Sequence, residues 1–153
     1  MDPKVLVIVG SKSDEEAMQG CLDNLRKFDI PYEFHVSSAH RAPERTKGLA
    51  VGARARGVQV IIAGAGMAAH LPGVVASFTT LPVIGVPLPG SHLSGVDSLH
   101  AIVQMPPGVP VASMAIGSAG GKNAAIFAAQ IMGLSDPGMA RKLDDFKKEL
   151  AAV

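Results

Sequence analysis

The sequence has no tryptophan and only one cysteine and one tyrosine among its 153 residues. Aromatic residues make up 4% of the chain, which is poor material for stacking the bases of a nucleic-acid strand. The single cysteine, Cys21, allows no intrachain disulfide and no cysteine-ligated zinc site. These shortages favour a reducing compartment and argue against zinc-finger, disulfide-scaffold and single-strand-binding classes of protein.

Charge is also scarce in this chain. Charged residues make up 18% of the sequence and the net charge is +1, which argues against nucleic acid or an anionic membrane as the main partner. From Gly57 to Gly121, the only Asp, Glu, Lys or Arg is Asp97. Pro, Gly and His interrupt this stretch too often for a membrane span. We therefore expect it to form a buried parallel sheet, a large subunit interface, or both.

Apolar runs alternate with helical patterns along the chain. Strands are expected at Val5–Val9, Glu33–Ser37, Val58–Ala63, Pro82–Val86 and Val111–Ile116. Helices are expected over residues 13–28, 43–56, 70–79, 94–105, 119–132 and 137–152. This alternation is typical of a parallel sheet covered by helices on both faces. We predict an α/β fold, a three-layer α/β/α sandwich with a flavodoxin-like five-stranded sheet and a C-terminal helix.

The first expected helix carries two local signals. Ser13 and Glu16 have the spacing of a capping box, which predicts Ser13 as the N-cap residue. Cys21 lies at helical spacing from Ala17 and Leu25. We therefore interpret Cys21 as a small core residue on the apolar face of this helix.

Polar residues follow the first strand, at an edge of the sheet where parallel α/β folds bind ligands. Gly10 permits a tight turn, and Ser11 and Ser13 stand beside the amides of a helix N-terminus, which favours an anion cradle. Asp14 can accept hydrogen bonds from a ribose diol. The alternative interpretation is that Ser13 and Asp14 only cap the helix.

The second strand is followed by Ser38, His40 and Arg41. Arginine can hold a phosphate through two hydrogen bonds, and histidine suits proton transfer near neutral pH. The pair therefore indicates an anion contact beside a general acid or base. A solvated loop with a surface arginine is the alternative.

The third strand is followed by the run Gly64-Ala65-Gly66-Met67-Ala68-Ala69-His70-Leu71-Pro72-Gly73. Its start resembles a dinucleotide-binding fingerprint, but it follows the third strand rather than the first. No Asp or Glu stands about 20 residues later, where a ribose-binding acid belongs. We interpret it as a loop whose backbone lets a flat ligand approach closely, with His70 as a second polar group.

Two further patterns are interpreted as coincidental. The segment Gly117–Asn123 is similar to a phosphate loop, but its spacing is one residue short and Asn123 replaces the Ser or Thr that would hold magnesium. His92 and His100 flank Asp97, yet a helix starting near Ser94 leaves His92 outside it. We therefore expect no metal ion and no hydrolysis of a nucleoside triphosphate.

Taken together, these segments resemble the PurE family of purine biosynthesis, in order and over nearly the whole chain. The matching segments are Gly10-Ser11-Lys12-Ser13-Asp14, Ser38-Ala39-His40-Arg41, Ala63–Gly73, Ser94–Leu99 and Ile102–Pro106. The resemblance is to the class I branch, the N5-carboxyaminoimidazole ribonucleotide mutases. Class II members, the aminoimidazole ribonucleotide carboxylases, usually carry Lys after the His of the second segment. Met67 departs from the pattern, because many relatives have Gly there.

The resemblance implies an isomerase of IMP biosynthesis with no cofactor. The carboxyl group would leave nitrogen as carbon dioxide and then add to C4 of the same aminoimidazole ribonucleotide, without metal, ATP or biotin. It implies that His40 supplies the proton at nitrogen and later removes one from C4. The residues expected to bind the substrate are Ser11, Ser13, Asp14, Ser38, Arg41, Ala65, Gly66, His70 and Leu71.

The resemblance also implies the setting in which the protein works. The family forms octamers, which would explain the charge-poor middle of the chain. We expect a single PurE-like domain over residues 1–153, with a nucleotide substrate, no nucleic acid and no membrane as partner. The chain begins Met1-Asp2-Pro3-Lys4 and runs directly into a strand, so we expect a cytoplasmic location.

Two other functions are alternatives to the mutase. The first is carboxylation of aminoimidazole ribonucleotide by free carbon dioxide, which Arg41 and the Ala68-Ala69-His70 segment disfavour. The second is a non-catalytic, flavodoxin-like nucleotide-binding module. Such a module needs no proton-transfer histidine at a strand end, and His40 stands at one.

Overall fold

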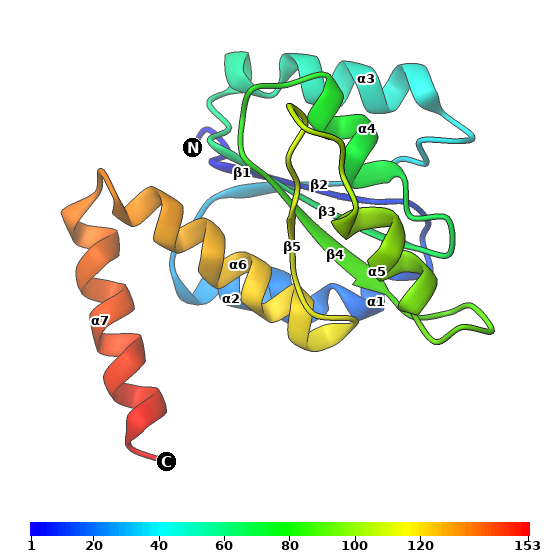
Figure 1. Cartoon of the computed structure of the whole chain (residues 1–153). Coiled ribbons are helices and arrows are strands. Elements are labelled where there is room, and N and C mark those ends of the chain that lie inside the picture. The colour runs from blue at the N-terminus through cyan, green and yellow to red at the C-terminus, as the bar shows by residue number, and fades with distance from the viewer.

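The central sheet consists of five parallel strands, and the structure, a computed structural model, describes residues 1–153. The strands are β1 (Val5–Val9), β2 (Tyr32–Val36), β3 (Val60–Gly66), β4 (Val83–Leu88) and β5 (Ala112–Ser113). Their order across the sheet is β2-β1-β3-β4-β5 (Figure 1). This is the flavodoxin-like order, whose switch point lies between β1 and β3.

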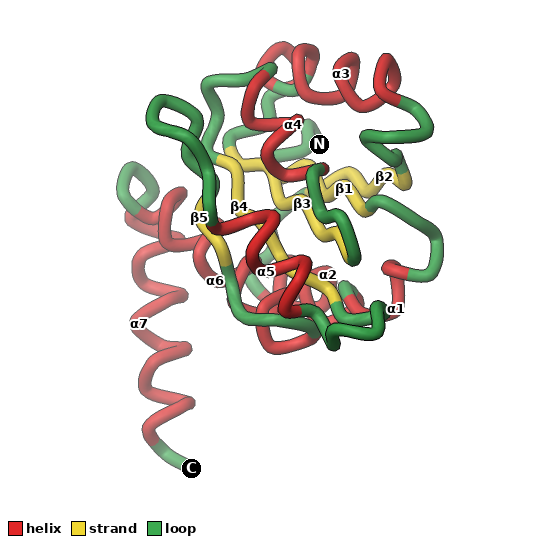
Figure 2. Tube along the Cα trace, turned by 45° about the vertical axis from the view of Figure 1, so that its right-hand side comes forward, coloured by secondary structure: helices red, strands yellow, loops and turns green.

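Helices cover both faces of the sheet (Figure 2). They are α1 (Asp14–Ala17), α2 (Gln19–Lys27), α3 (Pro43–Gly52), α4 (Leu71–Ser77), α5 (Val96–Val103), α6 (Ser118–Gly133) and α7 (Pro137–Ala151). None of these helices combines the length and the apolar character needed to cross a membrane. The predicted α/β/α architecture with a C-terminal helix is confirmed.

The alternation of side chains along β1 divides the apolar residues between two cores. Val5, Val7 and Val9 face a core shared with α2 and α6. Leu6 and Ile8 face the other core, shared with α3, α4 and α5. Because successive residues of a strand point to opposite faces, a strand buried on both faces must be apolar throughout. All residues of β1 are fully buried, as the sequence predicts.

The last helix, α7, turns back at the end of α6, and its C-terminal end projects away from the sheet (Figure 1). Its N-cap is Asp136, whose carboxylate accepts hydrogen bonds from the amides of Gly138 and Met139. Phe146 packs edge-on against Phe28 at the end of α2, with ring centroids 5.4 Å apart. The helix is therefore fixed to the α2–α6 face by an aromatic contact.

The first helix is not the single capped helix that the sequence predicts. It is divided at Met18 into α1 and α2. Ser13 has helical backbone angles and makes no capping hydrogen bond, so the predicted capping box is wrong. The Ser13 hydroxyl instead lies 2.7 Å from the Ser11 hydroxyl, because both belong to one tight turn after β1.

The third strand is longer than predicted. Gly64, Ala65 and Gly66 were expected in a loop, but they belong to β3 and pair with Val86, Pro87 and Leu88 of β4. At Gly66 an added Cβ would lie 3.3 Å from the Leu88 carbonyl oxygen. The small residues therefore let β3 run close beside β4 up to the edge where the pocket lies.

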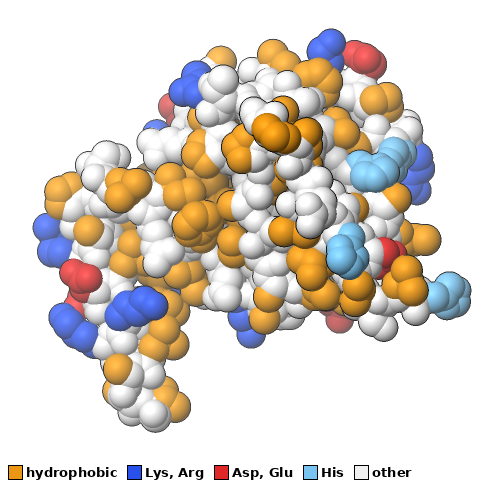
Figure 3. All heavy atoms as spheres, in the orientation of Figure 1, with side chains coloured by type: hydrophobic (Ala, Val, Ile, Leu, Met, Phe, Trp, Pro, Cys, Tyr) orange, Lys and Arg blue, Asp and Glu red, His pale blue; other side chains and the backbone are white.

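The predicted charge-poor stretch lies partly at the surface. It includes the core strands β3 and β4, but Leu93, Val96 and Val103 are 64%, 48% and 47% exposed. Figure 3 shows hydrophobic side chains over β5 and α5, with few charged groups near the centre of this face. We call the surface formed by Leu93, Val96 and Val103 the α5 apolar face.

Candidate active site

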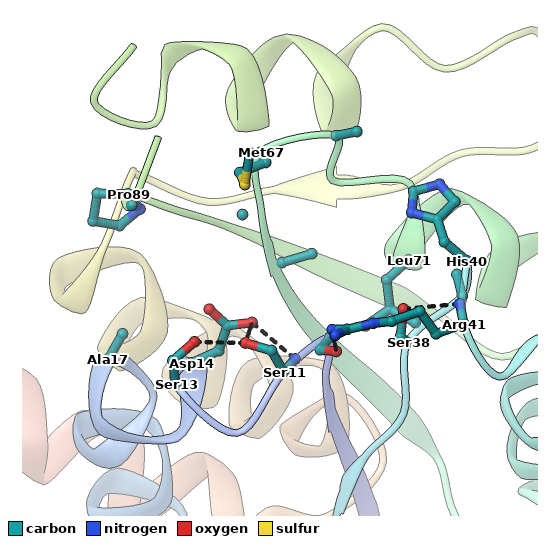
Figure 4. Close-up of a pocket in the computed structure, with 16 residues that line it drawn as sticks. Ser11, Ser13, Asp14, Ala17, Ser38, His40, Arg41, Met67, Leu71 and Pro89 are labelled. Carbon is teal, nitrogen blue, oxygen red and sulfur yellow. Dashed lines mark hydrogen bonds between the residues drawn. The ribbon is translucent and has the colours of Figure 1, made fainter. Parts of the chain in front are cut away.

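A cavity of about 760 Å³ opens at the carboxyl ends of β1, β2, β3 and β4 (Figure 4). Its lining residues are Gly10, Ser11, Ser13, Asp14, Ala17, Ser38, Ala39, His40, Arg41, Ala65, Gly66, Met67, Ala68, Leu71, Pro89 and Gly90. Ligands of parallel α/β folds bind at this edge, beside the strand-order switch. The cavity therefore lies where the order of the strands predicts a binding site.

Asp14 closes the turn after β1. Its Oδ2 accepts hydrogen bonds from the backbone amide of Ser11, at 3.0 Å, and from the Ser11 hydroxyl, at 3.2 Å. Burial raises the pKa of Asp14 above its ordinary value, while the Ser11 hydrogen bonds and the charge of Arg41 act in the opposite direction. Oδ1 of Asp14 accepts no hydrogen bond from the protein and remains for a ligand hydroxyl.

Arg41 reaches from the end of β2 toward the end of β1. Its Nη2 donates to the Gly10 carbonyl at 3.4 Å, and its amide donates to the Ser38 hydroxyl at 3.1 Å. The guanidinium has five N–H donors, and the Gly10 carbonyl is its only hydrogen-bond acceptor in the protein. Figure 4 shows it extended toward Ser11. This arrangement leaves donors free for an anion beside the two serine hydroxyls.

His40 contacts His70 across the mouth of the site. Nε2 of His40 lies 2.9 Å from Nδ1 of His70, and the rings meet edge to face with centroids 5.0 Å apart. One nitrogen of the contact must donate and the other must accept, so at least one of the two rings is neutral while the contact exists. Nδ1 of His40 makes no hydrogen bond within the protein, which leaves it available to a substrate.

A buried hydrogen bond fixes the loop that carries His40. The hydroxyls of Ser37 and Thr46 lie 2.8 Å apart and join the end of β2 to α3. The Ala42 amide donates to the Ser38 carbonyl at 2.8 Å, which closes the loop into a turn. His40 and Arg41 are exposed at the tip of this turn, so they project from a fixed base.

Met67 has an unusual backbone for a residue with a side chain. Its φ is +52°, in the left-handed region that favours glycine. Its side chain is 63% exposed and lines the cavity. Glycine would suit this backbone better, and the methionine places a long apolar group at the cavity mouth.

The structure brings almost all of the predicted site residues together. Ser11, Ser13, Asp14, Ser38, His40, Arg41, Ala65, Gly66 and Leu71 line the cavity. His70 stands outside the lining and reaches the site through His40. Sequence reasoning missed Pro89 and Gly90, which follow β4. Only the strand order, which places β4 beside β3, could have drawn attention to them.

No three His, Cys, Asp or Glu side chains gather in a way that could hold a metal ion.

Comparison with known proteins matches residues 4–152 to the AIR carboxylase family. The chain belongs to the AIR carboxylase family. It is 55% identical to the N5-carboxyaminoimidazole ribonucleotide mutase of Saccharolobus solfataricus, over 97% of this chain and 92% of the relative. It is also 55% identical to the mutase of Bacillus subtilis, over 95% of this chain and 90% of the relative. The predicted PurE resemblance is therefore confirmed.

The fold agrees with a solved AIR carboxylase family structure. The crystal structure of Treponema denticola PurE superposes with a TM-score of 0.88 and covers 98% of this chain and 92% of that chain. Sequence identity to it is 28%. The two chains therefore share the same α/β fold, although their sequence identity is about half of the 55% identity between this chain and the two mutases.

Proposed function

We propose that the cavity isomerises N5-carboxyaminoimidazole ribonucleotide to its C4-carboxylated isomer, with His40 as the group that moves the proton. Mutases 55% identical over nearly the whole chain support the activity itself. The chain is thus an isomerase of purine biosynthesis, an N5-carboxyaminoimidazole ribonucleotide mutase. The observation that supports the role of His40 most directly is its position in the cavity lining beside Arg41 and the Ser11 turn.

The phosphate and ribose would occupy the side of the cavity formed by β1 and β2. Arg41 supplies a positive charge with unused donors, and Ser11 and Ser13 supply hydroxyls beside it. Asp14 would repel a phosphate if it contacted one directly, so its free Oδ1 suits a ribose hydroxyl instead. Binding at this end places the aminoimidazole toward Ala65 and Gly66.

The chemistry needs one proton to be added and one to be removed. Cleavage of the N–carboxyl bond releases carbon dioxide and leaves the bonding electron pair on nitrogen, which takes a proton. C4 then attacks carbon dioxide and loses its own proton as the new bond forms. The two transfers balance, so a single histidine can serve as acid first and base second. His40 offers Nδ1 for this purpose while His70 holds Nε2.

Carbon dioxide must stay in the cavity between the two steps. The proposed place for carbon dioxide is beside three uncharged lining residues, Ala65, Gly66 and Leu71. Their side chains offer no charged group that would bind water or an ion in place of this small neutral molecule. Closure of such a site excludes water and prevents escape of a reactive intermediate. We propose that these three residues contact the aminoimidazole ring and the released carbon dioxide.

A comparison of two substrates tests the proposed activity. Purified protein is incubated without ATP, either with the N5-carboxylated nucleotide or with aminoimidazole ribonucleotide and bicarbonate. We expect rapid formation of the C4-carboxylated product from the first and slow formation from the second. Faster reaction of the second mixture would favour the direct carboxylase. A failure of both, with the nucleotide still bound, would favour a binding module.

We also propose that copies of this chain assemble into a closed octamer through surfaces that include the α5 apolar face. Leu93, Val96 and Val103 are exposed on a face with few charges, and obligate interfaces are larger and more apolar than transient ones. Light scattering at micromolar concentration tests the assembly. An active 15.7 kDa monomer would contradict it.

We further propose that residues 1–153 act as one domain and that the protein works in the cytoplasm. The family match from residue 4 to residue 152 supports one domain. A single reduced cysteine and a role in purine biosynthesis support the location. Cell fractionation with an antibody to the chain tests the location.

A further inference from the structure

A second groove lies where α3 and α4 end, whereas the active-site cavity lies where these two helices begin. The helices pack against each other on one side of the sheet (Figure 1). The groove has a volume of about 530 Å³ and shares no lining residue with the cavity. Its lining residues are Val51, Arg54, Ser77, Phe78, Thr79 and Thr80. We call it the α3–α4 groove, and the proposed reaction does not use it.

Two positive charges at the α3–α4 groove have no counterion in the protein. Arg54 lines the groove, and Nζ of Lys47 lies 5.6 Å from the centroid of the Phe78 ring. None of the ion pairs of the chain includes either cation, and no Asp or Glu lines the groove. Unpaired charges of one sign beside a groove without carboxylates attract an anion.

The polar groups of the groove have unused hydrogen-bond donors. Nη2 of Arg54 donates to the Thr80 hydroxyl at 2.8 Å, and the Leu81 amide donates to the Thr79 hydroxyl at 3.1 Å. Both threonine hydroxyls accept in these bonds, and neither donates to a group of the protein, so each keeps its own O–H. The Arg54 guanidinium also keeps further N–H groups. A guanidinium with free donors suits a phosphate group, which it can hold through two hydrogen bonds.

Apolar surface lies beside these donors. The side chains of Val51 and Phe78 line the groove and are 59% and 37% exposed. An aromatic ring is a stacking surface for a nucleobase of any sequence, because every base has a flat face. A ligand with a phosphate at one end and a flat ring at the other therefore matches both parts of the groove.

We propose that the α3–α4 groove is a second ligand site, which binds a mononucleotide. Arg54, Thr79 and Thr80 contact its phosphate, and Phe78 contacts its base. The proposal does not depend on the mutase activity. The competing explanation is that Arg54 and Lys47 only offset the carbonyl ends of the helices. That role needs no ligand, and loss of either charge would then change stability alone.

Calorimetry tests the site with the active-site cavity saturated by aminoimidazole ribonucleotide. The probes are adenosine monophosphate, adenosine and inorganic phosphate. We expect adenosine monophosphate to bind, and the other two probes to bind at least about tenfold more weakly, because each lacks one half of the contacts. Absence of binding by adenosine monophosphate would overturn the site. Equal affinity for inorganic phosphate would overturn the contact between Phe78 and the base.

Arg54→Gln locates the site, because it removes the charge and keeps a polar side chain. We expect the Kd for adenosine monophosphate to rise about tenfold or more, with the rate of isomerisation and the melting temperature nearly unchanged. Arg45→Gln is the matched control, since Arg45 is also exposed on α3 but does not line the groove. Unchanged affinity in Arg54→Gln, or an equal loss in Arg45→Gln, would contradict the proposal. Absence of isomerisation in the unmodified protein would overturn the proposed function instead.

Discussion

Nε2 of His40 lies 2.9 Å from Nδ1 of His70, so the loops after β2 and β3 meet through two imidazoles. His70 is the residue that precedes α4 and stands outside the cavity lining, whereas His40 lies within it. The contact leaves Nδ1 of His40 without a partner in the protein. His70 therefore has the geometry of a positioning residue for the proposed proton carrier.

His70→Phe keeps a ring but removes the hydrogen bond to His40. We expect kcat to fall by roughly 10- to 100-fold, the effect of a slightly misplaced reacting group, while KM changes little. His70→Asn retains donors and acceptors and should lose less. Steady-state kinetics on both variants test this, and a raised KM with unchanged kcat would assign His70 to substrate binding.

Arg41→Ala should weaken binding of the nucleotide through loss of its phosphate contact. A charge-assisted hydrogen bond contributes roughly 1.5–3 kcal/mol, so Kd should rise about 10- to 150-fold. Calorimetry with aminoimidazole ribonucleotide measures the change. The dephosphorylated nucleoside is the control, since the substitution should leave its affinity nearly unchanged. An equal loss for both ligands would place Arg41 away from the phosphate.

Asp14→Asn separates stability from binding. Burial raises the pKa of Asp14 in the folded chain above its value in the unfolded chain. The folded protein therefore loses stability as the pH rises from the pKa of the unfolded chain through the pKa of the folded chain, because the buried carboxyl ionises. At neutral pH we expect the Asn variant to melt at the same temperature or slightly higher. The difference in melting temperature between the variant and the unmodified protein should vanish at a pH below the ordinary pKa of Asp.

Affinity for the nucleotide should nevertheless fall in Asp14→Asn, because the ribose loses a charged acceptor. Thermal melts at several pH values, together with binding at pH 7, test both effects. A clear loss of stability at neutral pH would show that the carboxylate itself holds the turn after β1.

Cys21 should be unreactive in the folded protein. Burial raises the pKa of its thiol to about 12, and its side chain is fully buried in the core shared by α2 and α6. The thiolate is the reactive form. A thiol reagent at pH 8 should therefore label the chain only after denaturant is added. Stoichiometric labelling of the native protein would contradict this.

Much of the fold was predictable because buried parallel strands are continuous apolar runs, such as Val5–Val9. Strand ends were less predictable. Gly64–Gly66 has weak strand propensity, and its pairing with β4, together with the pairing of Gly64 with Val9 of β1, extends β3 through it. The prediction of a capping box at Ser13 was wrong for a local reason. Ser and Asp side chains can form hydrogen bonds within a turn as well as cap a helix, and here they do so with Ser11.

The site was predictable where a chemically distinctive residue followed a strand. Ser11, His40 and Arg41 were predicted in this way, and the structure places all three in the lining of the cavity. Pro89 and Gly90 have no such chemistry, and their place depends on the lateral order of strands. The His40–His70 contact depends on two loops meeting in space, which a spacing in the chain does not specify.

The most direct test of the account is the conversion of N5-carboxyaminoimidazole ribonucleotide by His40→Asn, with nucleotide binding measured on the same sample. Asparagine keeps a polar side chain but cannot carry a proton between the two steps. We predict that nucleotide affinity stays within a few-fold while the rate of conversion falls by roughly 10²- to 10⁴-fold. Conversion within a few-fold of the unmodified protein would contradict the assignment of His40 as the proton carrier.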